Sequence, residues 1–132
     1  MVKGNLSNGF DLVKHDDGTF TVTHVEKGRT MKGDNLKDAV YKFRTHYIEP
    51  YNKRIQKGDK FSGDELIDIF QIVTAPHTGC DKGIRKFIEE DDTNIYDDAQ
   101  NDGMTVQELF ERLPDVMGKL QLHRYIQNGF KI

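Results

Sequence analysis

The residues whose types and spacing best suit chemistry are His77, Cys80 and Asp81, which follow one another as His-x-x-Cys-Asp. A zinc site needs about four ligands and usually draws them from two spaced pairs, and the sequence offers no second pair. A Cys–His nucleophile needs a third residue that orients the histidine, and none can be named. We therefore assign no catalytic residue and no metal ligand, and we expect no cofactor.

Residues 89–102 form the most acidic segment, which we interpret as a loop with seven carboxylates in fourteen positions. Asp98 to Gly103 resembles the first half of an EF-hand calcium loop, but Glu108 falls at position 11 instead of position 12. Two interpretations without an ion stay open, a solvated loop or an acidic surface for a basic partner. The partner-binding candidates in this segment are Glu89, Glu90, Asp91, Asp92, Asp97 and Asp98.

A basic stretch lies nearer the start of the chain and is the alternative binding face. With Tyr41 and Tyr51, its cations could stack on bases and contact phosphates. Acidic residues in the same stretch dilute the charge, so a solvated helix face is the simpler interpretation. The candidate basic residues on the predicted helix 37–57 are Lys37, Lys42, Arg44, Lys53 and Arg54.

Two copies of one short motif indicate where helices begin. Phe61-Ser62-Gly63-Asp64-Glu65-Leu66 and Met104-Thr105-Val106-Gln107-Glu108-Leu109 share the order apolar, Ser or Thr, two variable residues, Glu, Leu. In such a capping box the hydroxyl accepts a free backbone N–H, and the Glu reaches back to the cap residue. The flanking apolar pair sets the angle at which the chain enters. Helices are therefore predicted to start at residues 63 and 106.

Hydrophobic periodicity supplies the remaining elements. Residues 10–14, 19–25 and 29–32 predict strands joined by turns at 16–18 and 26–28. An apolar stripe at helical spacing then runs from Leu36 to Tyr47, and Pro50 is predicted to bend this helix or to end it near Ile48. Four shorter helices are expected at about 63–74, 80–88, 105–113 and 115–127. The predicted fold is α+β: a three-stranded antiparallel β-meander packed on a long helix, followed by a compact bundle of short helices.

Length and charge point to one domain with two unlike halves. Of the 132 residues, 1–60 carry 12 Lys and Arg against 8 Asp and Glu, a net of +4, and 61–132 carry 7 against 14, a net of −7. We treat 1–132 as a single domain, with 1–57 as the meander plus long helix and 58–132 as an acidic helical half. The lone Cys80, the polar start without a signal peptide and the lack of long apolar runs favour a small soluble cytoplasmic protein without a membrane partner.

One segment invites comparison with a known family. Gly18-Thr19-Phe20-Thr21-Val22, continued through Lys32-Gly33-Asp34-Asn35-Leu36-Lys37-Asp38-Ala39-Val40, resembles the start of HicB-type antitoxin domains, which also run strands into a Gly-Asp-x-Leu-x-x-Ala helix entry. The resemblance covers residues 18–40 only. The acidic helical remainder departs from the family, so the resemblance implies no function here.

We therefore expect a non-enzymatic protein that acts by protein–protein interaction, as a regulator, inhibitor or assembly factor. Its partner would be another protein with a basic surface. The alternative is a nucleic-acid or nucleotide-binding protein that uses the basic helix 37–57, and a weaker one is an enzyme that depends on carboxylates or His77. Only three Ala occur beside many Asp, Asn, Lys and Gly, a composition common in AT-rich phage genomes, so a viral origin is a further hypothesis.

Overall fold

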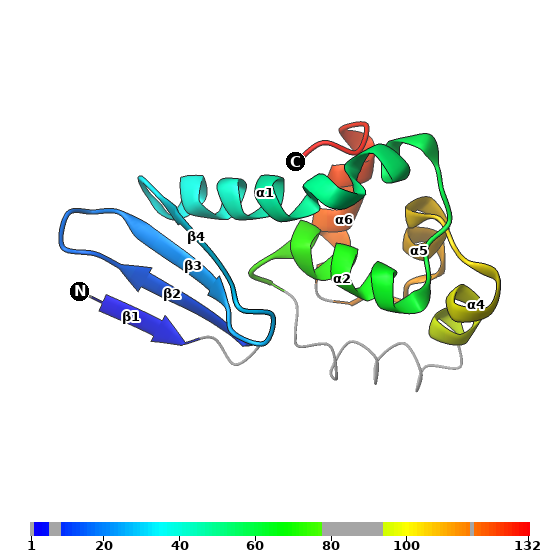
Figure 1. Ribbon diagram of the computed structural model, residues 1–132, viewed down its shortest axis with the longest axis horizontal. Helices are drawn as coiled ribbons and strands as arrows, with labels where there is room; N and C mark the ends of the chain where they lie inside the picture. Colours follow the sequence, from blue (N-terminus) through cyan, green and yellow to red (C-terminus); the bar gives the residue numbers. More distant parts are fainter. Residues whose placement is uncertain (1, 6–8, 78–93, 117) are drawn as a thin grey trace.

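Four antiparallel strands form a meander at one end of the molecule (Figure 1). They are β1 (Val2–Asn5), β2 (Phe10–Lys14), β3 (Phe20–His24) and β4 (Arg29–Gly33), and each pairs with the next in chain order. This computed structural model describes residues 2–5, 9–77, 94–116 and 118–132. The three predicted strands and the α+β architecture are confirmed, and β1 is a further strand before them.

The helix α1 (Leu36–Lys57) covers one face of the sheet and continues beyond it (Figure 1). It starts where the Asn35 side chain accepts a hydrogen bond from the backbone N–H of Asp38, and it ends at Gly58, whose φ of 77° suits a residue without Cβ. Near its start α1 approaches β4 so closely that a Cβ on Gly33 would lie 2.3 Å from the Ala39 nitrogen. Pro50 lies inside α1, so of the two alternatives the end near Ile48 is wrong and the helix continues to Lys57.

The helical half is built around α2 (Gly63–Thr74), nine of whose twelve residues are buried. It contacts α1, α4 (Ile95–Asp102) and α6 (Lys119–Gln127), while α5 (Val106–Arg112) packs on α6. The predicted helix at 80–88 lies outside the described residues. Among the residues that are described, none of the helices combines the length and the apolar character that a membrane crossing requires.

Both predicted helix starts are confirmed, and the two copies of the motif meet in space. Ser62 accepts from the backbone of Glu65 while Glu65 reaches back to the Ser62 N–H, and Thr105 accepts from the Glu108 N–H. The residues just before these caps, Phe61 and Met104, exchange two backbone hydrogen bonds of 2.8 and 2.9 Å. This isolated antiparallel bridge ties the entrance of α2 to the entrance of α5.

The interpretation of residues 89–102 as a loop is wrong where the structure describes it. Residues Ile95–Asp102 form the helix α4, with Ile95 and Ala99 buried one turn apart. Their burial stabilises a helix that the polar composition conceals. The Asp98 to Gly103 segment is therefore mostly helical and does not form the open loop that wraps a calcium ion.

The core consists of two hydrophobic clusters, one in each half of the molecule. In the sheet half, Phe10 and Val22 pack with Ala39 and Phe43 of α1. The helical half contains a larger cluster, to which α2, α4, α5, α6 and the C-terminal part of α1 contribute buried side chains. Tyr47 of α1 packs against both clusters, so the long helix joins the two halves.

Candidate functional site

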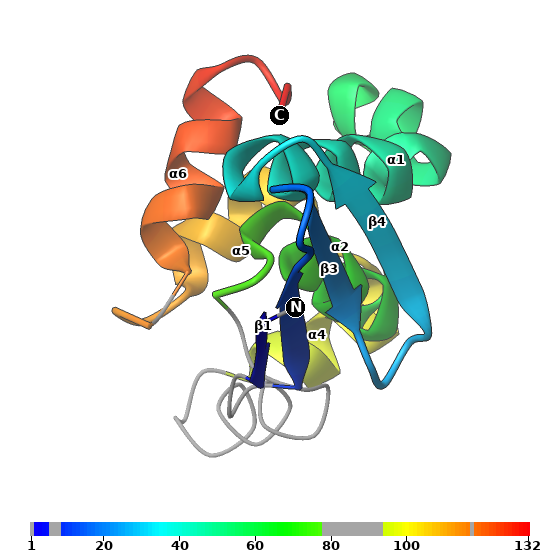
Figure 2. The same ribbon diagram turned by 90° about the vertical axis from the view of Figure 1, so that its left-hand side faces the viewer.

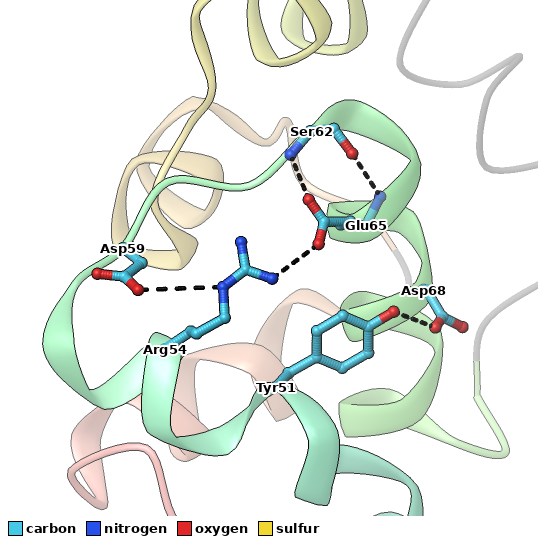
Figure 3. A network of polar contacts seen from close by, with 6 residues as sticks. All are labelled: Tyr51, Arg54, Asp59, Ser62, Glu65 and Asp68. Atoms are coloured by element: carbon cyan, nitrogen blue, oxygen red, sulfur yellow. Dashed lines mark hydrogen bonds and ion pairs between the residues drawn. The ribbon is translucent and has the colours of Figure 1, made fainter.

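A polar network fixes the junction between the sheet and the helices. Asp68 of α2 accepts hydrogen bonds from both terminal nitrogens of Arg29 in β4, at 2.7 and 3.0 Å. The Tyr51 hydroxyl of α1 donates to the same carboxylate at 2.6 Å (Figure 3). One carboxylate therefore holds three elements together.

The titration of this network follows from its geometry. Burial by itself raises the pKa of Asp68, but the hydrogen bonds from Arg29 and Tyr51 outweigh that effect, so the pKa lies below its ordinary value. Burial and the bond to Asp68 raise the pKa of the Tyr51 hydroxyl. Near neutral pH the carboxylate is charged and the tyrosine is a neutral donor.

The hydroxyl of Tyr47 is held by two backbone hydrogen bonds. It accepts from the Thr30 N–H at 3.0 Å and donates to the Thr30 carbonyl at 3.1 Å. The Arg29 guanidinium lies 5.3 Å from the centre of the Tyr47 ring, within cation–π distance. Because Thr30 lies on the edge strand β4, the tyrosine also occupies backbone groups that another strand could otherwise use.

These two tyrosines border a groove along α1, which we call the aromatic groove. Its volume is about 590 Å³, and it is lined by Arg29, Thr45, His46, Tyr47, Glu49, Pro50 and Tyr51. A second groove of about 290 Å³ lies on the other side of Thr45 and Glu49 and includes Tyr41, which is 54% exposed. The exposed ridge of α1 thus lies between two hollows.

Pro50 leaves one backbone carbonyl of α1 without its usual helical donor. A proline inside a helix has no N–H for the carbonyl four residues earlier, which here is that of His46. His46 and Pro50 both line the groove. The His46 carbonyl therefore lacks the N–H that the residue four positions later supplies elsewhere in a helix, and it belongs to a residue that lines the groove.

The five predicted basic residues do not form one face. Lys42 pairs with Asp38 at 3.0 Å, and Arg54 pairs with Glu65 at 2.9 Å and lies 3.9 Å from Asp59 (Figure 3). Lys37 and Lys53 lie about 24 Å apart along the helix axis, because an α-helix rises about 1.5 Å per residue. Arg44 points inward and donates to the Ala75 carbonyl from Nε at 2.8 Å and from Nη2.

Only two of the six predicted acidic residues are described. Asp97 and Asp98 lie in the first turn of α4, where negative charge suits the helix dipole. Asp98 pairs with Arg112 of α5 at 2.7 Å, so it fastens two helices, whereas Asp97 is exposed. Glu89, Glu90, Asp91 and Asp92 lie outside the described residues, as do Cys80 and Asp81 of the His-x-x-Cys-Asp cluster.

Sequence reasoning missed the aromatic groove although its signal was present. Tyr47 and Tyr51 stand one helical turn apart on either side of Pro50. This spacing places both rings near the helical turn that contains the proline. Their hydrogen-bond partners, Thr30 and Asp68, lie 17 residues away in opposite directions along the chain, so no local pattern could supply them.

No family model, curated protein or solved structure matches this chain. The likeness of residues 18–40 to HicB-type antitoxin domains is thus without support from these comparisons. Across the described ranges, no three His, Cys, Asp or Glu side chains are grouped in a way that could hold a metal ion.

Proposed function

We propose that the protein acts by binding another protein, and that the aromatic groove on α1 receives a segment of that partner. The observation that carries the proposal is the pair Tyr47 and Tyr51, whose hydroxyls are fixed on Thr30 and Asp68. Rings that are already immobile lose little conformational entropy when a partner docks on them.

The chemistry of the groove supports a protein partner. Tyr and Arg are enriched at the energetic centres of protein interfaces, and here Arg29 already shares its charge with Asp68. The His46 carbonyl offers one directional acceptor to a backbone or side-chain N–H. Glu49 has no ion pair among the described residues, so it favours a partner segment that carries Lys or Arg.

Nucleic-acid binding by the basic helix has less support. Two of its cations are neutralised by carboxylates, one points inward, and the remaining two are far apart. Phosphate contacts need unpaired cations that follow the backbone together.

The test is an affinity pull-down from lysate of the source cell, with and without nuclease, using wild type and two matched variants. Thr45 lies on the ridge that lines both grooves, so Thr45→Arg adds a long cation at their shared border, and Gln56→Arg places the same residue on an exposed part of α1 that lines neither. We expect Thr45→Arg to weaken retention of the partner about tenfold or more, and Gln56→Arg to leave it unchanged. Circular dichroism checks that both variants are folded.

Three outcomes would count against the groove. Equal retention by both variants would remove it from the interaction. In a third variant, Asp97→Lys, an exposed charge of α4 is reversed, and loss of the partner in this variant but not in Thr45→Arg would place the interface at the acidic residues. Recovery only of nuclease-sensitive material would favour nucleic acid.

A further inference from the structure

A smaller cavity of about 190 Å³ lies between α1, α2, α6 and the residues that follow α6. Figure 2 shows the end of the chain lying between α6 and α1. The polar residues that line this cavity, which we call the basic cavity, are Arg44, Gln121, Arg124, Tyr125, Asn128 and Lys131. None of the lining residues is Asp or Glu, so three cationic residues line the cavity without an acidic side chain; Arg44 is half-buried, and Arg124 and Lys131 are exposed.

The three cations of the basic cavity form no ion pair with a carboxylate in the described part of the chain. Arg44, Arg124 and Lys131 have no carboxylate within ion-pair distance there. This contrasts with Lys42, Arg54 and Arg112, each of which pairs with an Asp or a Glu. Like charges that gather without a counter-charge repel one another, and an anion between them removes the repulsion.

Arg44 is the most constrained of the three. It is half-buried, and burial lowers its pKa. Its Nε and Nη2 donate to the Ala75 carbonyl, which leaves further N–H groups of the guanidinium for a ligand. Within the described residues the acceptor of this half-buried cation is a neutral carbonyl, which offsets little of the cost of desolvating the charge, and an anionic ligand would offset more of it.

The Tyr125 hydroxyl is an independent indication of a ligand. The side chain lines the cavity and is only 3% exposed, and its hydroxyl has no hydrogen-bond partner within the described residues. Burial raises the pKa of Tyr125 to about 12, so the group is a neutral donor near neutral pH. A buried hydroxyl without a partner is destabilising, and this one belongs to a residue of the cavity that the three cations also line.

The size of the cavity limits what fits. Its 190 Å³ corresponds to roughly six water molecules at about 30 Å³ each, so the part of a ligand that lies inside it is smaller than a nucleotide, while the open side can admit the rest of a larger molecule. A single tetrahedral oxyanion fits with room for water. The planar guanidinium groups of two arginines suit the paired oxygens of phosphate.

We propose that the basic cavity binds one phosphate group, with Arg44, Arg124 and Lys131 supplying charge and Tyr125 donating a hydrogen bond to a phosphate oxygen. The site involves side chains other than those of the aromatic groove, so it stands independently of the function proposed above. Phosphate can arrive as the free ion or as the end group of a larger molecule.

The test is titration calorimetry of the full chain with inorganic phosphate, with chloride at matched ionic strength as the reference. We expect one site per chain. Arg124→Gln and Tyr125→Phe should each weaken binding about tenfold, the value of one hydrogen bond to a charged group. The matched control Lys53→Gln removes an exposed charge of α1 that does not line the cavity, and it should bind as wild type does.

Thermal unfolding gives a second readout that a purely structural role would not produce. Without phosphate, Tyr125→Phe should unfold at the same or a higher temperature than wild type, because it removes an unpaired buried hydroxyl. With phosphate, the rise in unfolding temperature should be smaller for Tyr125→Phe than for wild type.

Absence of heat and of any thermal shift with phosphate would overturn the proposal. An equal loss of affinity in Lys53→Gln and Arg124→Gln would also overturn it, because it would show general charge screening. Methyl phosphate distinguishes the source. Affinity equal to that of inorganic phosphate indicates that the site accepts a phosphate carried on a larger molecule, and loss of binding indicates the free ion.

Discussion

Replacing Asp68 by Asn tests whether one carboxylate holds the two halves of the molecule together. Asp68 and Arg29 side chains are only 13% and 21% exposed, and Tyr51 donates to the same carboxylate. Asn keeps the shape and one acceptor oxygen but loses the charge. It also turns an NH₂ group toward donors, which leaves at least one of them without an acceptor.

The expected cost follows from the burial of this pair. Loss of a hydrogen bond to a charged group costs about 1.5–3 kcal/mol, and breaking a fully buried ion pair costs about 3–5 kcal/mol. Because both partners retain some exposure, we expect a loss of about 2–3 kcal/mol in the free energy of unfolding. With an unfolding entropy of about 2.1 cal/mol/K per residue, this lowers the unfolding temperature by roughly 7–11 °C.

The assay is thermal and urea unfolding followed by circular dichroism at pH 7, for Asp68→Asn, Arg29→Gln and the double variant. If the pair acts directly, the double variant should cost at least about 1 kcal/mol less than the sum of the two single variants. The control Lys42→Gln removes one member of an exposed pair and should change stability by less than about 0.5 kcal/mol.

Two results would refute this reasoning. One is a loss below about 0.5 kcal/mol in Asp68→Asn, which is the size of an ordinary surface substitution. The other is strict additivity of the Arg29 and Asp68 substitutions, which would mean that their contact contributes nothing beyond the separate packing of each side chain.

Two further predictions concern acid stability and the contact of α4 with α2. The pKa of Asp68 is lowered in the folded protein, so its stabilisation is present above the unfolded pKa of about 4 and is lost as the pH falls through the folded value. The gap in unfolding temperature between wild type and Asp68→Asn should therefore narrow from pH 6 to pH 3, and a constant gap would contradict this. Gly63→Ala should lower the urea midpoint by an amount equivalent to about 1–3 kcal/mol, because the new Cβ would lie 2.7 Å from the Tyr96 ring; unchanged stability would show that α4 yields without cost.

Local patterns were sufficient to predict much of the fold. The strands from residue 10 onward and the starts of α2 and α5 follow from alternation and from capping residues, which act within a few residues of one another. The elements that were missed depend on distant contacts. β1 is short and contains Gly4, and it is held by pairing with β2, whereas α4 is stabilised by burial of Ile95 and Ala99.

The choice of ionic partner could not be derived from the sequence. The five basic residues of helix 37–57 look alike in the sequence, but in space one binds a backbone carbonyl and two are neutralised by carboxylates. Arg54 finds Glu65 because the turn after Gly58 folds α2 back on α1 (Figure 3). Whether a charged residue is available to bind a partner therefore depends on the carboxylates and carbonyls that lie near it in the folded protein.

The sequence by itself determined where most helices and strands begin, because caps, turns and apolar periodicity act through nearest neighbours. Only the tertiary structure decided which side chains meet. Arg29 and Asp68 are 39 residues apart in the sequence, and the cavity between α1 and α6 brings Arg44 to Arg124 and Tyr125. Such contacts exist because burial of the shared core forces distant segments together, and that burial is a property of the whole chain.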